Sequence, residues 1–209
     1  MSSVSPIKKK VLVLFAHPAQ RGSEVNVPMV KVAGWISGVT VVDLYADYPA
    51  LDIDIEAEQD RLRAHDVIVF AFPMYWYSTP AILKEWQDQV LEYGFAYGSE
   101  GNALRGKVFF AAATTGGPEE AYTAEGYNHF SVRQLFAPLE QMASLCGMTY
   151  LPPFILHRAR SAKALKLVDP HLEAWEHLLE ALTHDTLDLA SVRDADKLNE
   201  AAYALTGEV

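Results

Sequence analysis

The sequence predicts an α/β fold, in which a five-stranded parallel sheet has helices on both faces. Five short runs of branched and aromatic apolar residues are typical of buried strands, and amphipathic stretches separate them. The chain has 209 residues, half of them hydrophobic and 21% charged, which suits one α/β domain with a full core. We expect a single domain over residues 1–209, with its core at about 8–160 and a helical C-terminal extension at about 169–206. The predicted strands are residues 10–16, 39–44, 67–73, 107–115 and 149–156.

A helix is predicted between each pair of successive strands, as in a doubly wound fold. The first is centred on residues 23–36, but Pro28 prefers a first turn, so the regular helix is expected to begin near Asn26. Gly147 fits the C-cap of the fourth helix. Pro152 and Pro153 interrupt the fifth strand, which is therefore expected at an edge of the sheet. The other helices are residues 55–65, 81–93 and 131–146.

The net charge and the composition indicate which binding partners are disfavoured and in which cellular compartment the protein is expected. A net charge of -10 disfavours binding to nucleic acid or to an anionic membrane surface. The single cysteine, Cys146, excludes an internal disulfide, fits a reducing compartment and is expected to be buried. The apolar run after Lys8–Lys10 is shorter than the roughly 7–15 residues of a signal-peptide core. No stretch approaches the ~18–20 apolar residues of a membrane helix, so we expect a cytoplasmic protein without membrane insertion.

Ligands of open α/β sheets bind beyond the carboxyl ends of the strands, which directs attention to the loops there. The loop after the first strand lacks both G-x-G-x-x-G and G-x-x-x-x-G-K-[ST], which disfavours an ordinary dinucleotide fold and a P-loop. Ser23 and Asn26 stand instead at a helix N-terminus, where backbone N–H groups and the helix dipole favour a phosphate. Ordinary helix capping explains each of these two residues equally well when it is taken alone.

The loops after the third and fourth strands add an aromatic surface and open backbone. Three consecutive aromatics, Tyr75, Trp76 and Tyr77, follow Met74, and a flat aromatic ligand would cover them. Their alternative role is to cover a sheet edge or a subunit interface. Thr114–Gly117 places two glycines at a strand end, where backbone can approach a ligand closely, although a simple turn has the same composition. The three loops together favour a site for flavin mononucleotide (FMN).

These residues resemble the flavodoxin-like NAD(P)H:quinone oxidoreductases, and among them the ancillary subunits of glutathione-gated potassium-efflux antiporters. The resemblance spans about residues 10–157 and implies a three-layer sandwich with strand order 2-1-3-4-5. The matching segments include Phe15-Ala16-His17-Pro18, Ser23-x-x-Asn26, Pro73-Met74-x-Trp76-Tyr77-Ser78-x-Pro80-x-x-Leu83-Lys84-x-Trp86-x-Asp88, Gly94-Phe95-Ala96-Tyr97-Gly98, Thr114-Thr115-Gly116-Gly117 and Cys146-Gly147.

The resemblance implies a homodimer that transfers hydride from NADPH or NADH through a bound flavin to quinone-like acceptors, in a two-electron ping-pong cycle. The flavin is expected to be FMN, with FAD as the alternative. Phe95 and Tyr97 match a loop that shapes the acceptor pocket, often from the partner subunit. The residues that the resemblance assigns to the flavin are His17, Ser23, Asn26, Met74, Tyr75, Trp76, Tyr77, Thr114, Thr115, Gly116 and Gly117.

Two catalytic candidates follow the paired glycines. Tyr122 has the spacing of a tyrosine that stabilises charge during hydride transfer in the family, whereas the matching histidine position holds Asn128, next to His129. His129 takes the relay role only if the loop shifts by one residue; otherwise it is a surface histidine.

Two further expectations concern a series of acidic residues and a second role of the protein. The acidic series at residues 52–58 is expected to be a solvated turn and the first turn of a helix, and no metal site is predicted. A second role, as a regulatory subunit docked on a potassium-efflux antiporter at the inner membrane, is compatible with the reductase.

Overall fold

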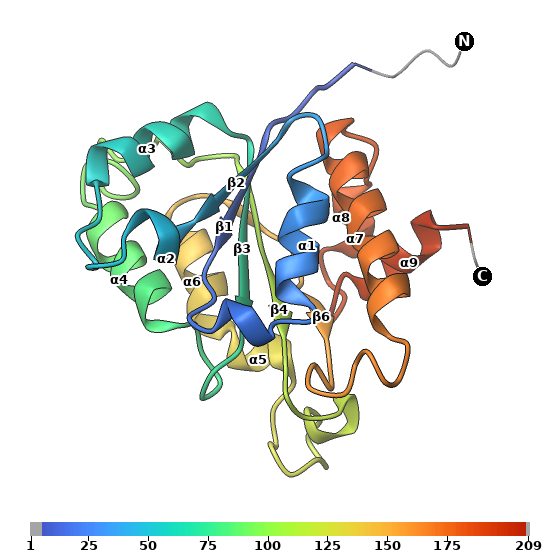
Figure 1. Ribbon diagram of the computed structural model, residues 1–209. Coiled ribbons are helices and arrows are strands. Elements are labelled where there is room, and N and C mark those ends of the chain that lie inside the picture. The colour runs from blue at the N-terminus through green and yellow to red at the C-terminus, as the bar shows by residue number, and fades with distance from the viewer. Residues whose placement is uncertain (1–5, 208–209) are drawn as a thin grey trace.

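The computed structural model describes residues 6–207, and the statements below concern this part of the chain. Its parallel sheet has the order β2-β1-β3-β4-β5, with β6 also paired to β4 (Figure 1). This confirms the predicted three-layer α/β sandwich with order 2-1-3-4-5. Residues 1–5 and 208–209 of the predicted domain lie outside the described part. The strands are β1 (Val11–Phe15), β2 (Val39–Asp43), β3 (Val67–Pro73), β4 (Val108–Thr114), β5 (Thr149–Tyr150) and β6 (Phe154–Leu156).

The fifth predicted strand is divided into two short strands at the sheet edge. β5 pairs with the beginning of β4, and β6 pairs with its end, at Ala112–Thr114. Pro152 and Pro153 lie between them, and because proline has no backbone N–H, neither can donate to a ladder there. The edge position and the interruption at the two prolines are thus both confirmed.

The helices lie in two layers, one on each face of the sheet (Figure 1). Helix α1 begins at Asn26, as predicted from Pro28. The single helix predicted at 131–146 is two helices, because Pro138 in the first turn of α6 cannot donate to the carbonyl group four residues earlier. The helices are α1 (Asn26–Ala33), α2 (Leu44–Asp47), α3 (Ile55–Ala64), α4 (Ala81–Val90), α5 (Val132–Leu135), α6 (Ala137–Leu145), α7 (Val168–Thr183), α8 (Leu189–Val192) and α9 (Asn199–Leu205).

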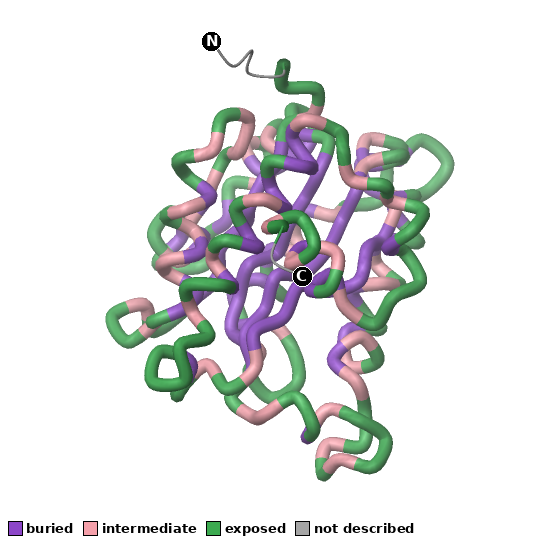
Figure 2. The backbone as a smooth tube through the Cα atoms, turned by 90° about the vertical axis from the view of Figure 1, so that its right-hand side faces the viewer, coloured by how far each residue is buried: buried purple, intermediate pink, exposed green. Residues whose placement is uncertain are grey.

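Alternate residues of the central strands point into two separate cores. Leu12 and Leu14 of β1 pack toward α3, α4 and α6, whereas Val11 and Val13 pack toward α1 and α7. Both faces of the central strands β1, β3 and β4 are buried, and the loops beyond their carboxyl ends are much more exposed (Figure 2). This arrangement leaves those loops as the accessible end of the sheet. Within residues 6–207, no helix has both the length and the apolar character needed to cross a membrane.

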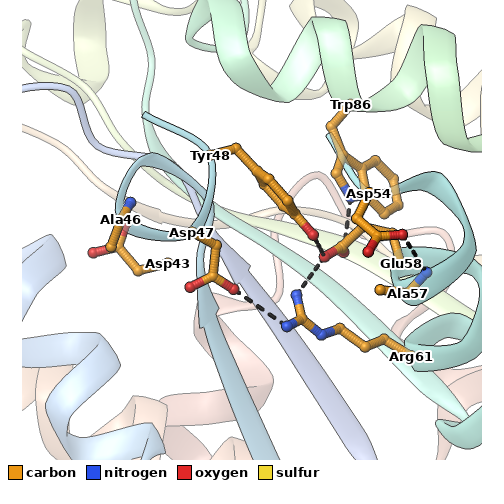
Figure 3. Close-up of polar contacts among 9 residues, drawn as sticks. All are labelled: Asp43, Ala46, Asp47, Tyr48, Asp54, Ala57, Glu58, Arg61 and Trp86. Atoms are coloured by element: carbon orange, nitrogen blue, oxygen red, sulfur yellow. Dashed lines mark hydrogen bonds and ion pairs between the residues drawn. The ribbon is translucent and has the colours of Figure 1, made fainter. Parts of the chain in front are cut away.

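Glu58 in the acidic series is buried, contrary to the solvated position expected for it. Its side chain is fully enclosed and accepts hydrogen bonds from the Tyr48 hydroxyl at 2.7 Å and from Trp86 Nε1 at 2.9 Å, and it pairs with Arg61 (Figure 3). A buried carboxylate is stable only when such donors surround it. Asp54 does behave as expected, because it accepts from the Ala57 N–H as the N-cap of α3.

The C-terminal extension packs against the sheet and the first helix. Trp175 of α7 is buried and donates from Nε1 to the Met29 carbonyl of α1 at 3.0 Å. Beyond α7, the chain returns to β6, where Leu198 N–H donates to the Pro153 carbonyl at 2.9 Å. The extension therefore lies along the outer edge of the sheet at β6.

Candidate functional site

Loops after β1, β3 and β4 meet at a cavity of about 350 Å³, as the sequence predicts for the carboxyl ends of these strands. A fourth segment, after β6, completes the wall with Ala159 and Arg160. The cavity is not lined by Trp76, Tyr77 or Gly117. The predicted cofactor residues that do line it are His17, Ser23, Asn26, Met74, Tyr75, Thr114, Thr115 and Gly116.

Asn26 presents an unused hydrogen-bond donor at this cavity. Its side chain is 4% exposed, and its Oδ1 accepts from Thr114 Oγ1 at 2.9 Å. The Nδ2 group is buried and has no hydrogen-bond partner in the described part of the chain. Buried amide groups are normally paired, so an unpaired donor on a cavity wall points to a ligand acceptor. Helix capping does not account for Asn26, whereas Ser23 does contact the first turn of α1, accepting from Val27 N–H at 3.2 Å.

His17 is a neutral donor at the end of β1. Its Nδ1 accepts from Ala19 N–H at 3.1 Å, which assigns the ring proton to Nε2. Burial lowers the pKa of His17 below its ordinary value, although its own backbone and Asp43 oppose the shift. The imidazole is therefore uncharged at neutral pH and offers one N–H to the cavity.

The aromatic loop is a tight two-residue turn with left-handed backbone. Tyr75 and Ser78 exchange two backbone hydrogen bonds of 3.1 Å, while Trp76 and Tyr77 have φ angles of 49° and 63°. Such angles cost non-glycine residues on the order of 1–3 kcal/mol and concentrate at functional sites. Trp76 is 93% exposed, so it covers no sheet edge within the described chain. The turn thus holds a large aromatic ring in solvent near the mouth of the cavity.

The loop after β4 is closed by aromatic side chains on one side and open on the other. A Cβ atom at Gly117 would lie 2.8 Å from the Tyr127 hydroxyl and 3.3 Å from the Tyr122 ring, whereas one at Gly116 would meet nothing within 4 Å. Gly117 therefore lets both tyrosine side chains pack against the turn, and the space beside Gly116 is free for a ligand. Thr115 Oγ1 lies 2.9 Å from His157 Nδ1, which ties this loop to the end of β6.

The two catalytic candidates occupy different surroundings. Tyr122 is partly buried against the His157 ring, at 5.4 Å between centroids, and burial raises its pKa. His129 is exposed in the 119–130 loop, with a φ of 62°. Its neighbour Asn128 instead accepts a hydrogen bond from the Tyr77 hydroxyl at 3.0 Å. The catalytic roles of Tyr122 and His129 stay predictions, and the structure brings only Tyr122 into a polar cluster.

Phe95 and Tyr97 lie away from this cavity within one chain. Helix α4 runs from the carboxyl end of β3 back to the opposite end of the sheet, where the strands begin, and the 91–98 loop follows it there (Figure 1). Phe95 is 7% exposed, with the Arg63 guanidinium 4.9 Å above its ring, and Tyr97 packs edge-on against Tyr93. A role of these residues in an acceptor pocket requires a second copy of the chain and remains a prediction.

Sequence reasoning missed the segment after β6. His157, Ala159 and Arg160 follow a strand end, so the rule that pointed to the other three loops applied there as well. Arg160 is exposed at the cavity and forms no ion pair within residues 6–207. This part of the chain also contains no cluster of three or more His, Cys, Asp or Glu residues that could hold a metal ion.

Comparison with known proteins places the chain in a family. The sequence profile described as "Flavodoxin-like fold" matches residues 9–179. The glutathione-regulated potassium-efflux system ancillary protein KefG of Cronobacter sakazakii is 46% identical over 170 residues, which cover 81% of this chain and 92% of that protein.

Solved structures agree on the fold but carry several names. The general stress protein 14 of Treponema denticola, in complex with FMN, is 38% identical, with a TM-score of 0.78 over 83% of this chain and 99% of that one. A tryptophan halogenase (Th-Hal) structure from Streptomycin violaceusniger is 42% identical, with a TM-score of 0.78 over 80% and 97%. An NADPH-quinone reductase of P. pentosaceus is 30% identical, with a TM-score of 0.71 over 83% and 97%.

The fold, the cavity and these relatives together confirm the resemblance to quinone reductases and to antiporter ancillary subunits, and the chain belongs to the family of proteins with the flavodoxin-like fold.

Proposed function

We propose that this chain is an FMN-dependent NAD(P)H:quinone oxidoreductase that works by a two-electron ping-pong cycle. The observation that carries the proposal is the buried, unpaired Asn26 Nδ2 on the wall of the cavity formed by the strand-end loops. The FMN complex of a relative that is 38% identical supports this choice of flavin. Bound FMN would supply the hydride chemistry, accepting from NAD(P)H and donating to the acceptor.

The residues of the cavity suit the parts of such a ligand. Asn26 and the neutral His17 offer N–H donors, and Arg160 offers a positive charge for a phosphate. The backbone beside Gly116 is open enough for a flat ring to approach. In this proposal the aromatic turn at Tyr75–Tyr77 lies along the ring and helps to exclude water from it.

Binding of FMN to variants of Asn26 tests the proposal. We expect Asn26→Ala to raise the Kd for FMN at least about fivefold, because one buried hydrogen bond is lost. Asn102→Ala is the matched control, since Asn102 is exposed and lies on a different loop. Quenching of flavin fluorescence during titration measures both constants. If wild-type protein binds no FMN, or if the two variants bind equally, this use of the cavity is contradicted.

A homodimer is the proposed assembly. Several aromatic side chains in the loops after β3 and β4 are exposed in the single chain, and a second copy would cover them. They are Tyr75, Trp76, Tyr77, Tyr127 and Phe130. Light scattering after size-exclusion chromatography checks the assembly, and a monomer at micromolar concentration would contradict it.

A regulatory subunit of a potassium-efflux antiporter is the second candidate function. The 46% identity to KefG over 92% of that protein favours it, and in this role the chain would act in the cytoplasm beside a membrane partner. Potassium efflux from cells that lack their own ancillary subunit separates the two roles. If efflux is restored equally by wild-type protein and by Asn26→Ala, regulation does not depend on tight binding of FMN. If neither restores it, the regulatory role is wrong.

A further inference from the structure

Thr115 and His157 form a polar pair directly behind the proposed flavin cavity. They follow the ends of two adjacent parallel strands, β4 and β6, in which Thr114 pairs with Leu156. The Thr115 side chain is 1% exposed, and its Oγ1 lies 2.9 Å from His157 Nδ1 and 3.1 Å from the Gly117 carbonyl oxygen. The pair therefore connects the cavity loop to the segment after β6.

The single proton of the Thr115 hydroxyl determines which group donates in its contact with His157. A threonine hydroxyl has one proton, and the Gly117 carbonyl can only accept, so Thr115 donates to Gly117. Thr115 must then accept from His157, which assigns the ring proton of His157 to Nδ1. Burial lowers the pKa of His157 to about 4, against the opposing effect of Glu119, so the ring is neutral at physiological pH. His157 is thus a fixed donor to the cavity loop.

Backbone contacts reinforce the same connection. Ala159 N–H donates to the Thr115 carbonyl, and Arg158 N–H donates to the Gly117 carbonyl, each at 2.9 Å. The Thr115–Gly117 turn is therefore held from one side by three consecutive residues after β6. A change at His157 removes the side-chain contact and leaves these backbone bonds in place.

The imidazole ring also supports Tyr122. The centroids of the His157 and Tyr122 rings are 5.4 Å apart, with an interplanar angle of 33°. Tyr122 also packs against Gly117, where a Cβ atom would lie 3.3 Å from its ring. The sequence has Asn128 where the resemblance expects a relay histidine, and His129 is exposed. The partly buried imidazole that contacts Tyr122 in this chain is that of His157.

We propose that His157 is a positioning residue of the flavin site, which orients the Thr115–Gly117 turn through Thr115 and holds the Tyr122 ring in place. The inference rests on the proposed function, since it assumes that this turn lies against FMN. His157 acts in this proposal only by fixing the positions of neighbouring residues and transfers no proton.

Two variants at position 157 separate the hydrogen bond from packing. His157→Phe keeps a flat ring against Tyr122 but has no donor, whereas His157→Asn places an amide N–H near the position of Nδ1. We expect His157→Phe to raise the Kd for FMN about fivefold, because one hydrogen bond to the binding turn is lost. His157→Asn should remain within about twofold of wild type, which a merely structural role of the ring would not produce.

A double-mutant cycle with Thr115→Val makes the test specific to the pair. Thr115→Val should raise the Kd at least as much as His157→Phe, because it also removes the bond to the Gly117 carbonyl, and the double variant should bind FMN no more weakly than Thr115→Val alone. Independent losses, which multiply in the double variant, would overturn the proposal, as would a His157→Phe protein that binds like wild type.

The outcomes also distinguish this inference from the proposed function. Wild-type protein that binds no FMN refutes the proposed function and the inference with it. Wild-type protein that binds FMN and reduces quinone, together with unchanged binding by His157→Phe, refutes only the inference. If His157→Phe does not fold, the other two variants provide the test. Weaker FMN binding by Thr115→Val together with wild-type binding by His157→Asn supports the inference, and any other pattern overturns it.

Discussion

The side-chain amide of Asn199 forms two hydrogen bonds with the backbone of Ile155, 44 residues earlier in the chain. Its Oδ1 accepts from Ile155 N–H at 2.9 Å, and its Nδ2 donates to the Ile155 carbonyl at 2.7 Å. Ile155 lies in β6 at the edge of the sheet, where unpaired backbone groups would otherwise face outward. Asn199 therefore acts in place of one residue of a neighbouring strand and fixes the segment that leads to His157.

Replacing Asn199 tests this edge contact. We expect Asn199→Leu to lower the free energy of unfolding by about 2–4 kcal/mol, because two buried backbone groups lose their partners. Urea denaturation measures the change. The exposed Asn102→Ala should stay within about 0.5 kcal/mol of wild type. An Asn199→Leu protein as stable as this control would show that water or other groups satisfy the β6 edge.

The buried Glu58 gives a second test of stability. We expect Glu58→Ala to lower the free energy of unfolding by about 3–5 kcal/mol, because the Tyr48 hydroxyl and Trp86 Nε1 lose their acceptor and Arg61 keeps only Asp47 as its partner. Glu56→Ala is the matched control, since Glu56 is exposed on the same helix. Equal urea midpoints for the two variants would contradict the network in Figure 3.

The buried His171 predicts a loss of stability in acid. Its ring is fully buried and stacks on Phe154 at 4.2 Å, and burial lowers its pKa from 6.5 to about 3. Because the unfolded chain takes up the proton first, the free energy of unfolding should fall as the pH decreases from about 6.5 to about 3. Above pH 6.5 the contribution is fully present.

A phenylalanine at this position should remove much of that dependence. We expect His171→Phe to lose less stability than wild type between pH 7 and pH 5, measured as thermal unfolding at each pH. The partly exposed His177→Phe on the same helix is the control and should follow wild type. If His171→Phe keeps the full pH dependence, another group is responsible.

Arg160 predicts a difference between two flavins. The exposed guanidinium lies at the cavity, and we expect Arg160→Ala to raise the Kd for FMN about threefold to fivefold through loss of an exposed ionic contact to the phosphate. Binding of riboflavin, which has no phosphate, should not change. Arg158→Ala is the control, because Arg158 pairs with Glu120. Equal effects on both flavins would place the phosphate elsewhere.

Much of the fold could be predicted because its signals are local. The run of apolar residues at 67–73 coincides with β3, and Pro28 locates the beginning of α1. The division at Pro138 was also visible in the sequence, since a proline in a helix cannot donate its backbone bond. The same holds for Pro152 and Pro153 in the fifth strand.

The missed features depend on distant partners. Glu58 stands among exposed acidic residues of a first helical turn, and its burial follows from Tyr48 and Trp86, which are 10 and 28 residues away. Asn199 lies in the C-terminal extension and finds its partner 44 residues earlier. Neither contact has a local pattern in the sequence. The three cavity loops could be predicted because strand ends of a parallel sheet meet by topology.

The reductase function is tested most directly by an anaerobic absorbance titration of the full chain loaded with FMN. NADPH is added first, and a benzoquinone is added after the excess nucleotide has been removed. We expect the flavin band to bleach on addition of NADPH and to return with one equivalent of quinone. Protein that retains FMN but is neither bleached by NADPH or NADH nor reoxidised by quinone would contradict the proposed reductase.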